Sequence, residues 1–488
     1  MKKTIMNLVL MLIAVCAFAQ APEWQWAIKA GSIGSDCGFG ITIDDNGNSY
    51  VTGWFEETAT FGSYSLTSSG ECDIFAAKMD ATGNWLWAAQ AGGTGWDEGY
   101  GITIDDNGNS YVTGTFGETA TFDSYSLTSG GEEDVFVAKM DATGNWLWAT
   151  KAGGSSYDYS WGIAIDDNGN SYVTGYFAGT ATFGFYTLTS SGNEDIFVAK
   201  MDANGNWQWA TRACGTGEDR GYAITADDTG NSYVTGNFED TATFGSYSLT
   251  SSGDLDIFVA KMDATGNWLW ATRAGGSDYA VGEAITIDNT GNSYVTGCFE
   301  GTATFGSYSL TSSGEVNIFV AKMDADGNWQ WATRAGGSTI DVGEAITIDN
   351  NGNSYVTGRF YGTATFGSYS LTGSGEGDIF VAKLGNETSV ENEFIPTKME
   401  LSNYPNPFNP ETTISFSIQQ NSKIELEIFN VKGQLVKSLI NGQQNAGDHS
   451  VIWNGKDDNG NNVCSGIYLY KLQVNNKSVA IRKCLLLK

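Results

Sequence analysis

The sequence predicts an all-β protein, in which a six-bladed β-propeller is followed by an immunoglobulin-like β-sandwich. Three observations support this fold class. The 488 residues include 63 Gly but only 5 Pro, which favours strands joined by tight turns. A unit of 61 residues occurs six times without gaps, and such a fixed period indicates one supersecondary unit stacked on its neighbours. No segment shows the apolar period that predicts a helix.

The N-terminus has the three parts of a secretory signal peptide. Lysines at positions 2 and 3 precede an apolar run over 8–18, and Ala17-Phe18-Ala19 provides a small-residue cleavage site. We expect residues 1–19 to be removed on export. Lipid attachment at Cys16 is an alternative, although the preceding valine is bulkier than the residue expected there. No other apolar stretch is long enough to span a membrane, so the sequence predicts a soluble, exported chain.

Charge divides the mature chain into two parts. The formal net charge is −31, from 25 Lys+Arg and 56 Asp+Glu, which argues against nucleic acid and anionic membranes as partners. The acidic excess lies within residues 20–389, so a linker is expected at 390–400 and a second domain at 401–488. The single histidine, His449, excludes a multi-His metal site and would have to serve any Ser-His-Asp triad.

Each repeat is predicted to form four antiparallel strands in two hairpins. In the second copy, GITID and SYVTGTF flank the turn at 106–109, and DVFVAKMD and NWLWAT flank the turn at 142–144. Asn and Gly at these turns accept the positive φ that a tight turn needs. Four-stranded units repeated radially form a β-propeller. The motif GNSYVTG places a tyrosine in every copy, at Tyr50, Tyr111, Tyr172, Tyr233, Tyr294 and Tyr355.

The ends of the repeat region predict how the ring closes. The region begins with a strand of the fourth type, Trp24–Ala27, and ends with one of the third type, Asp378–Lys383. We expect the N-terminal strand to complete the sixth blade, which would remove two exposed edges; an open superhelical stack is the alternative. The Trp-x-Trp pairs of the fourth strands are interpreted as packing between blades, and Lys139 and Asp141 as partners in an ion pair between blades.

The repeats resemble the SBBP β-propeller repeats of secreted bacterial proteins. The resemblance rests on D-x-G-x-x-I-x-I-D-x-x-G-N-S-Y-V-T-G and D-I-F-V-A-K-M-D-x-x-G-N-W-x-W, and it covers all six copies. The family's name refers to seven blades, whereas six copies occur here. The resemblance implies a fold but no single chemistry.

The repeats carry no pattern that predicts catalysis or a cofactor. No nucleophile, base and orienting group can be recognised together. A carboxylate pair could still support glycoside hydrolysis, so a propeller glycosidase or polysaccharide lyase is the enzymatic alternative. The turn at 44–48 and its copies contain D-x-N-x-N, which is similar to calcium loops but lacks their later bidentate carboxylate. Turn chemistry explains this pattern without a metal, and calcium bound in these turns is the alternative.

Comparison of the six copies with one another locates a candidate site. The turns after the first and third strands are nearly identical, whereas the loops before the first strands and the connections after the second strands differ. In an up-and-down blade the divergent segments share one face. Aromatic planes beside acidic acceptors suit a glycan or a basic peptide; drift in loops whose aspartates cap turns is the alternative. The candidate ligand-binding residues are Trp54, Trp96, Tyr157, Tyr159, Trp161, Tyr176, Tyr279, Asp36, Asp97, Asp158, Asp219 and Asp341.

The segment from Leu401 predicts about seven short strands of an immunoglobulin-like sandwich, with Trp453, Phe429 and Tyr468 in its core. It resembles the type A C-terminal sorting domain of the type IX secretion system through Y-P-N-P-F-N-P, N-V-K-G-Q-L-V, A-G-D-H-S-V-I-W-N-G-K-D-D-N-G, S-G-I-Y-L-Y and a basic end. The matching positions are Tyr404, Pro405, Asn406, Pro407, Trp453, Gly455, Gly460, Ser465, Gly466, Tyr468, Lys483 and Lys488. The resemblance implies export through the outer membrane of a diderm bacterium by the type IX machinery.

Together these features predict an exported, non-enzymatic binding or adhesion scaffold, either released or attached to the cell surface. Its expected partners are the secretion machinery and a glycan or protein ligand. A purely structural surface component is a further alternative.

Overall fold

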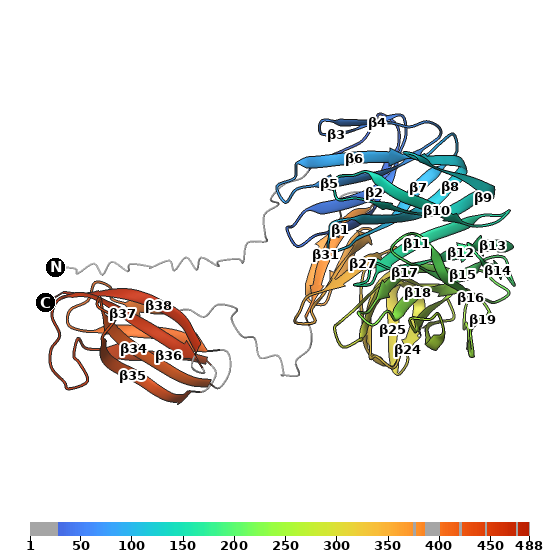
Figure 1. Cartoon of the computed structure of the whole chain (residues 1–488). Coiled ribbons are helices and arrows are strands. Elements are labelled where there is room, and N and C mark those ends of the chain that lie inside the picture. The colour runs from blue at the N-terminus through green and yellow to red at the C-terminus, as the bar shows by residue number, and fades with distance from the viewer. Residues whose placement is uncertain are drawn as a thin grey trace, which may run out of the picture. The chain divides into compact units, whose positions relative to one another are not determined.

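The computed structural model describes residues 28–373, 377–385, 401–418, 422–444, 447–474 and 477–487. The chain divides into two compact units, Met1–Asn386 and Glu387–Lys488. Every regular element of the described residues is a strand (Figure 1), which confirms the all-β prediction. The signal peptide, the strand at 24–27 and the linker at 390–400 lie outside the described residues. Within the described part of the chain, no helix has the length and apolar character needed to cross a membrane.

The first unit consists of repeated antiparallel sheets. In the first copy, strands pair in the order β1-β2-β5-β6, and the short hairpin β3-β4 lies between the two main hairpins. Their bounds are β1 (Asp36–Ile43), β2 (Ser49–Phe55), β3 (Thr58–Phe61), β4 (Tyr64–Thr67), β5 (Asp73–Met79) and β6 (Trp85–Ala91). The first copy thus shows the four strands in two hairpins that the sequence predicts for a repeat.

The next two copies follow the same pattern. The strands of the second sheet are β7 (Asp97–Ile104), β8 (Ser110–Phe122), β9 (Tyr125–Met140) and β10 (Trp146–Ala152), whose longer β8 and β9 absorb the short hairpin. The third copy contains β11 (Asp158–Ile165), β12 (Ser171–Phe177), β13 (Thr180–Phe183), β14 (Tyr186–Thr189), β15 (Asp195–Met201) and β16 (Trp207–Ala213).

The remaining copies are equally regular. The fourth contains β17 (Arg220–Ala226), β18 (Ser232–Phe238), β19 (Thr241–Phe244), β20 (Tyr247–Thr250), β21 (Asp256–Met262) and β22 (Trp268–Gly276). The fifth contains β23 (Ala280–Ile287), β24 (Ser293–Phe305), β25 (Tyr308–Met323) and β26 (Trp329–Ala335). The sixth contains β27 (Val342–Ile348), β28 (Ser354–Phe360), β29 (Thr363–Phe366), β30 (Tyr369–Thr372) and β31 (Asp378–Leu384).

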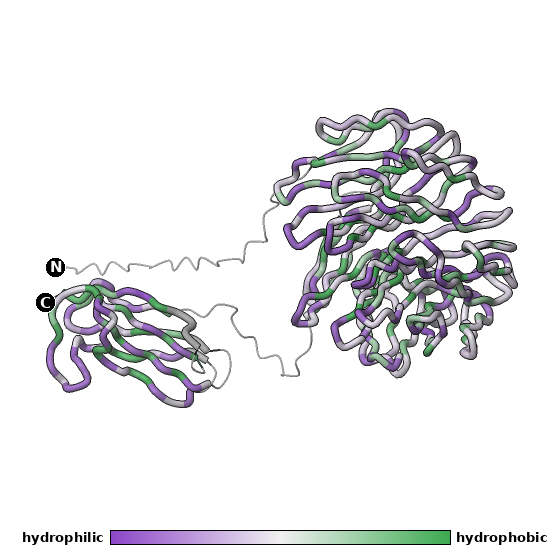
Figure 2. Tube along the Cα trace, viewed as in Figure 1, coloured by the Kyte–Doolittle hydropathy of each residue, from purple (hydrophilic) through white to green (hydrophobic). Residues whose placement is uncertain are grey.

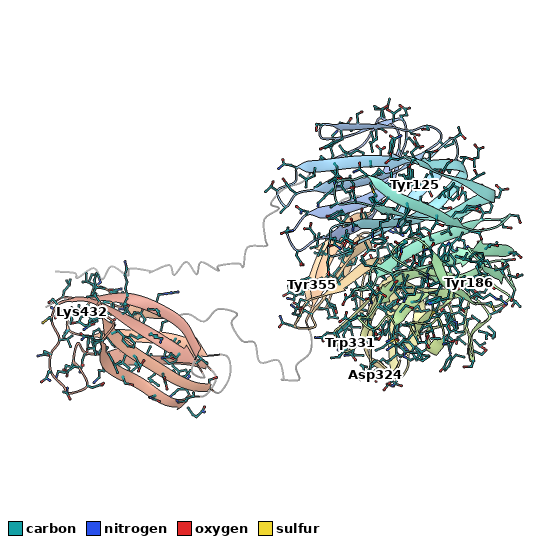
Figure 3. All side chains as sticks on the ribbon, viewed as in Figure 1. Tyr125, Tyr186, Asp324, Trp331, Tyr355 and Lys432 are labelled. Atoms are coloured by element: carbon teal, nitrogen blue, oxygen red, sulfur yellow. The ribbon has the colours of Figure 1, made fainter. Side chains whose placement is uncertain are left out.

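The turns within each sheet are held by one aspartate. In the turn between β25 and β26, Asp324 (labelled in Figure 3) accepts hydrogen bonds from the backbone N–H groups of Asp326 and Asn328, at 3.1 and 2.9 Å. Gly327 follows with a φ of 86°, a conformation that favours glycine. The sequence Asp-x-x-Gly-Asn therefore encodes the turn through local hydrogen bonds.

Neighbouring sheets are joined by the Trp-x-Trp pairs. The indole N–H of Trp87 donates to the carbonyl of Ala142 in the second sheet, at 3.1 Å, and that of Trp146 donates back to Gln90 in the first, also at 3.1 Å. One apolar cluster contains Ile74 of the first sheet and Phe136 of the second. The hydrophobic stretches follow the strands in Figure 2. The prediction that these tryptophans pack between repeats is confirmed.

The innermost strands β1, β7, β11, β17, β23 and β27 contact one another in this order. The two end sheets leave apolar faces uncovered, because Ile41 of β1 is 67 % exposed whereas its counterpart Ile102 is 7 % exposed. Ile379 of β31 is 82 % exposed, and its counterpart Ile318 only 1 %. Among the described residues the sixth sheet has three strands. Closure by Trp24–Ala27 therefore stays a prediction.

The second unit has two sheets around one core. One sheet pairs β32 (Ser402–Tyr404), β33 (Thr412–Ile418) and β36 (Gly447–Trp453), and the other pairs β35 (Leu435–Gln444), β34 (Ser422–Asn430), β37 (Gly466–Val474) and β38 (Lys477–Leu486). Trp453 and Tyr468 are core residues as predicted, but Phe429 is not. It lies on the opposite face of β34 from Ile428, since side chains alternate along a strand. Lys432 marks the β34–β35 turn in Figure 3.

Candidate functional site

The divergent segments of the six repeats lie on one face, which we call the variable face. There the loop before each first strand runs beside the connection after the second strand. Backbone hydrogen bonds join Gly117 to Trp96 at 2.8 Å, and Glu300 to Tyr279 at 2.7 Å. The two kinds of divergent segment are thus neighbours within these copies, and the nearly identical turns lie at the other ends of the strands.

Each first strand carries a β-bulge near this face. In the second sheet, Gly99 pairs with Gly114 and Gly101 pairs with Thr113, which leaves Tyr100 as the extra residue. A bulge changes the direction of a side chain and is common beside binding sites. We call the residues at this position in the six copies the bulge residues; they are Phe39, Tyr100, Trp161, Tyr222, Glu283 and Glu344.

Four of the bulge residues form a continuous aromatic arc across four sheets. Phe39 meets Tyr100 edge-on with ring centroids 5.0 Å apart, and Tyr100 stacks on Trp161 at 4.3 Å. Trp161 meets Tyr222 edge-on at 5.9 Å. Offset and edge-on arrangements at these distances are the favourable geometries for aromatic pairs. The arc thus joins rings from four sheets, with Tyr100 buried within it and Phe39 exposed at its end.

Glycines beside the arc allow the first strands to approach one another. A Cβ atom on Gly101 would lie 2.9 Å from the carbonyl oxygen of Trp161, and one on Gly40 would lie 3.0 Å from that of Tyr100. Such contacts are too close for any larger residue without a backbone shift. The last three copies carry alanine here, at Ala223, Ala284 and Ala345, and the bulge residue is a tyrosine in the fourth copy and a glutamate in the last two.

Predicted aromatic residues form a second run, which we call the rim stack. Tyr157 and Tyr159 stack with ring centroids 6.4 Å apart, and Tyr159 stacks on Tyr176 at 5.2 Å. The guanidinium of Arg220 lies over the ring of Tyr176, 5.1 Å from its centroid. The structure therefore brings together Tyr157, Tyr159 and Tyr176, and it places Trp161 in the neighbouring arc.

The other predicted aromatics stand apart from these runs. Trp96 is 47 % exposed in its loop, and Trp54 is half-buried on β2. Among the described side chains, neither makes a ring contact with the arc or the rim stack. Tyr279 forms a hydrogen bond with Cys298, and burial and the nearby Glu283 raise the pKa of its hydroxyl.

Glutamates accompany both aromatic runs. The hydroxyl of Tyr100 donates to Glu98. Burial raises the pKa of Tyr159, and the nearby Glu133 adds to this shift. Burial raises the pKa of Glu98; the hydrogen bond from Tyr100 opposes this shift, and the charge of Glu133 adds to it. The pKa of Glu283 is raised to about 7 by burial, with a further contribution from the charge of Glu344. The site thus holds carboxylates whose negative charge is poorly compensated.

Two arginines neutralise part of this charge. Arg220 lies 2.5 Å from Glu194 and 3.0 Å from Glu218, so it holds two carboxylates from neighbouring segments. Arg359 lies 2.5 Å from Glu344.

The predicted aspartates hold loops instead of facing a ligand. Asp97, Asp158 and Asp341 are fully buried, and each accepts a hydrogen bond from a glycine N–H four residues earlier, at 2.7, 2.8 and 2.6 Å. Asp219 is also buried and accepts from Glu239 at 3.2 Å, while the exposed Asp36 accepts from Ser32 at 2.6 Å. The alternative of turn-capping aspartates describes these residues better than the ligand-binding role.

A second aspartate, Asp73, lies close to the loop aspartate Asp97. Asp73 is buried, and its pKa is raised to about 6 by burial; Asp97 reaches about 7 through burial, with the charge of Asp73 as a further cause. In the fifth sheet Asn317 replaces the counterpart of Asp73, and its amide lies 3.5 Å from Asp341. The Asn317 amide provides a hydrogen-bond donor to Asp341. A proton shared between the carboxyl groups of Asp73 and Asp97 would provide the same kind of donor.

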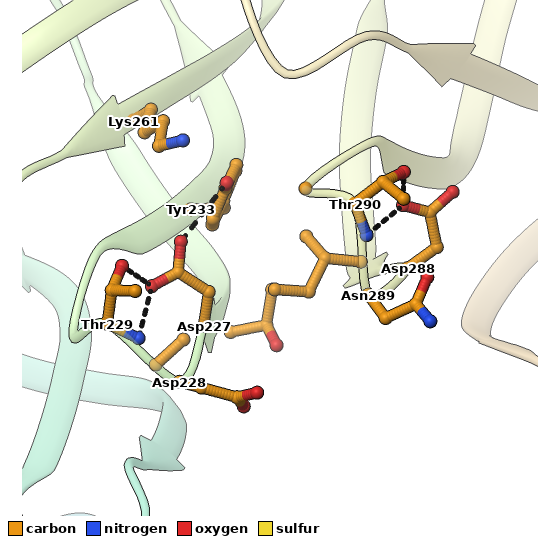
Figure 4. A pocket seen from close by; sticks show the side chains of 12 residues that line it. Asp227, Asp228, Thr229, Tyr233, Lys261, Asp288, Asn289 and Thr290 are labelled. Carbon is orange, nitrogen blue, oxygen red and sulfur yellow. Dashed lines mark hydrogen bonds between the residues drawn. The ribbon is translucent and has the colours of Figure 1, made fainter.

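The opposite face carries a cavity of about 550 Å³ between the β17–β18 and β23–β24 turns (Figure 4). Asp227 accepts from Thr229 Oγ1 at 2.7 Å, and Asp288 does the same from Thr290. Although burial alone would raise the pKa of Asp227, hydrogen bonds from Asn231 and Thr229 lower it. These carboxylates are thus occupied by their own turns, and among the described residues no three acidic, His or Cys side chains are placed to hold a metal.

The repeated lysines also belong to this face. Lys139 pairs with Asp105 of the same sheet at 3.5 Å and donates to the hydroxyl of Tyr111 at 2.5 Å. The expected partner, Asp141, instead accepts from Thr143 and Asn145 in its own turn. The predicted ion pair between blades is therefore wrong, because the turn engages Asp141 locally.

The YPNP motif of the second unit fixes the last strand. Asn406 accepts from the N–H of Leu485 at 2.9 Å and donates to the carbonyl of Lys483 at 3.2 Å. Trp453 donates to Lys456 at 3.0 Å, and Tyr468 donates to Cys464 at 2.8 Å. Tyr404 is 83 % exposed. The remaining motif positions are Pro405, Pro407, Gly455, Gly460, Ser465, Gly466 and Lys483, and Lys488 lies outside the described residues.

Sequence reasoning missed the bulge residues other than Trp161. Because the repeat has no gaps, comparing strand positions as well as loops would have revealed Phe, Tyr, Trp, Tyr, Glu and Glu at one position. Their juxtaposition depends on the bulge, which the sequence pattern does not show.

Comparison with known proteins agrees with this architecture. The model of the SBBP β-propeller repeat matches residues 25–54, 86–115, 147–176 and 330–359, and the FlgD Ig-like domain matches residues 405–478.

Two curated relatives share 26 % identity with the chain. One is the "Uncharacterized WD repeat-containing protein L264" of Acanthamoeba polyphaga mimivirus, matched over 70 % of this chain and 31 % of its own length. The other is "Regulatory protein FlaEY" of Caulobacter vibrioides, matched over 53 % of this chain and 29 % of its own length. The chain thus spans less than a third of either relative.

Solved structures with similarity include PorZ of Porphyromonas gingivalis, with 14 % identity, a TM-score of 0.22, and coverage of 94 % of this chain and 75 % of that one. A glycoside hydrolase family 43 arabinoxylan arabinofuranohydrolase of Bacillus subtilis has 14 % identity and a TM-score of 0.27, over 79 % and 93 % of the two chains. The chain thus carries SBBP β-propeller repeats and an FlgD-type Ig-like domain.

Proposed function

We propose that this protein is an exported, non-enzymatic scaffold that binds a ligand at the variable face. The observation that carries this proposal is the aromatic arc, in which Trp161 contacts Tyr100 and Tyr222, and Phe39 extends the arc from Tyr100. Contiguous ring faces beside hydrogen-bonding groups are a common form of ligand surface. The arc and the rim stack would supply contact area, and the neighbouring carboxylates would fix orientation.

An enzymatic role is a second candidate, supported by one observation. Glu283 has a pKa of about 7 beside Glu344, and one protonated and one ionised carboxyl group are the components of glycoside hydrolysis. Conversion of a bound sugar would establish this role, whereas binding without turnover supports the scaffold. A surface component without a ligand is the third possibility.

The test uses the mature full-length chain on arrays of glycans and of peptides. We expect binding that is lost in Trp161→Ala and retained in Leu86→Ala, since Leu86 is an exposed residue of β6 away from the arc. Equal binding by both variants, or no binding on either array, would contradict the proposed site.

The proposed architecture is a six-bladed ring with an immunoglobulin-like sandwich as the second unit. Closure by Trp24–Ala27 would cover Ile379 and Ile41, whose counterparts are buried. Burial of such side chains contributes about 1.5–3 kcal/mol each. Removing residues 20–27 should therefore lower the melting temperature of the mature protein; an unchanged value would contradict closure by this segment.

The proposed route begins with the signal peptide and ends with the sorting domain of the type IX system. In a diderm host with this system, removal of residues 401–488 should leave the propeller in the periplasm, and removal of residues 1–19 should leave it in the cytoplasm. Surface display of a chain without residues 401–488 would contradict the sorting role.

A further inference from the structure

We propose that the variable face binds the basic side chain of an arginine- or lysine-bearing peptide, seated at Glu98 and Glu133 between the aromatic arc and the rim stack. This inference rests on the proposed function, because it names the ligand class of the same site. It goes beyond the choice between a glycan and a peptide that the sequence leaves open.

One binding site of this kind is already occupied by an arginine of the protein itself. Arg220 lies over the ring of Tyr176 at 5.1 Å and pairs with Glu194 at 2.5 Å. An aromatic face and a carboxylate therefore hold a guanidinium at the boundary of the third and fourth sheets. Cation–π contact and a charge-assisted hydrogen bond reinforce one another in such a site.

The preceding boundary has the same carboxylate but lacks the cation and the ring beneath it, since Thr115 stands where the next copy has Tyr176. Counting back 61 residues, Glu133 corresponds to Glu194, whereas Tyr159 replaces Arg220. Glu133 is one of the groups that raise the pKa of the neighbouring Tyr159, a neutral side chain, and Glu98 accepts a hydrogen bond from Tyr100. The two carboxylates also repel each other, as the effect of Glu133 on the pKa of Glu98 shows.

A basic side chain would relieve this repulsion. Partly buried carboxylates without a cation are unfavourable, and an incoming guanidinium or ammonium group supplies the missing charge. The ring pairs Tyr100–Trp161 and Tyr159–Tyr176 border this site, but their faces are already covered by stacking and by Arg220, so the carboxylates and not the rings would supply the attraction. A neutral sugar would leave both charges uncompensated, and an anion would add to the repulsion.

The test measures tetraarginine binding by isothermal titration calorimetry, with tetraglutamate as the probe of opposite charge. The mature full-length chain should bind tetraarginine, more weakly at higher salt, and should not bind tetraglutamate. In Glu98→Gln/Glu133→Gln the dissociation constant should rise by about tenfold or more, since charge pairs of this kind contribute a kcal/mol or more. The control Asp45→Asn/Asp106→Asn removes two exposed charges from the opposite face. It should change the dissociation constant for tetraarginine by less than about twofold.

A second variant keeps the proposal testable if the double variant unfolds. Tyr159→Arg installs the arginine of the next copy, so it should pair with Glu133 and abolish tetraarginine binding while the melting temperature is retained. The control Asn107→Arg adds the same charge on the opposite face and should bind normally. If Tyr159→Arg and Asn107→Arg weaken tetraarginine binding equally, tetraarginine is attracted nonspecifically by the acidic protein, and the inference is wrong.

The arrays separate this inference from the proposed function. If Trp161→Ala abolishes binding of a glycan while tetraarginine does not bind the wild type, the binding scaffold stands and the basic-peptide ligand is wrong. If neither probe binds the wild type, both are wrong.

Discussion

The phenol ring of Tyr100 stacks on the indole of Trp161 with centroids 4.3 Å apart and 27° between their planes. The two residues occupy the same position in successive repeats, and each is the extra residue of a β-bulge. Their contact therefore joins two sheets at the variable face, and the loss of either ring would affect both packing and the proposed site.

Replacement of Trp161 by alanine should lower the free energy of unfolding by about 2 kcal/mol, because it removes one stacked and one edge-on ring contact and part of a buried indole. Trp96→Ala, in which the lost ring is largely exposed, should change it by less than about 0.5 kcal/mol. Chemical denaturation of both variants checks this. Similar losses for the two would show that the arc contributes nothing to stability.

Glu283 should make the protein less stable as the pH rises. Its pKa is raised to about 7 by burial and by Glu344, so the folded state retains a proton that the unfolded state loses near its ordinary value. Its favourable contribution is complete at low pH and is lost as the pH rises through about 7.

Glu283→Gln should remove this loss. Between pH 5 and pH 8 its free energy of unfolding should therefore exceed that of the wild type by on the order of 1 kcal/mol. Melting temperatures across this range provide the measurement, with Glu71→Gln as a comparison at an exposed carboxylate. A wild-type-like pH profile in Glu283→Gln would contradict the assignment.

The buried pair Asp73 and Asp97 predicts a second pH effect. Both pKa values are raised, to about 6 and about 7, so their contribution to stability also falls as the pH rises through these values. Asp73→Asn introduces the residue that the fifth sheet carries at Asn317.

This variant should be more stable than the wild type at pH 8, by on the order of 1 kcal/mol, and no more stable at pH 4. Thermal unfolding at the two pH values tests it. Destabilisation at pH 8 would show that Asp73 is needed as a carboxylate.

Trp87 should contribute strongly to cohesion between sheets. Trp87→Ala removes a buried indole and its hydrogen bond to Ala142, and such changes cost about 3–5 kcal/mol. Its neighbour Leu86 points outward on the same strand and provides the control, for which Leu86→Ala should cost less than about 1 kcal/mol. The comparison is made by denaturant unfolding, and equal effects would contradict the role of the indole.

In the second unit, Asn406→Ala should loosen the last strand, because it removes two hydrogen bonds to residues 483 and 485. The expected cost is about 1–3 kcal/mol, visible as faster hydrogen exchange in β38 of the full-length protein. Tyr404→Ala should leave exchange unchanged, because the side chain is exposed. A secretion defect in Tyr404→Ala with normal exchange would indicate direct recognition of the motif.

Much of the architecture could be predicted from the sequence because its causes are local. The turn aspartates and glycines specify each hairpin, the alternation of side chains specifies each strand, and the fixed period specifies the repetition of sheets. Phe429 shows the limit of this reasoning. Alternation along a strand does not say which of its two faces packs against the core, and Ile428 faces the core instead of Phe429.

The candidate site depended on the tertiary structure. Whether Tyr100 reaches Trp161 is decided by the bulge and by the close approach of two first strands at Gly101, and neither follows from a residue's own neighbours in sequence. The same holds for the loop aspartates, which look like exposed acceptors in the sequence but turn inward to bind their own loops. The sequence alone determined the repeating unit, because backbone geometry and turn chemistry are short-range; the folded chain decided which side chains meet, because those contacts join residues some 61 positions apart.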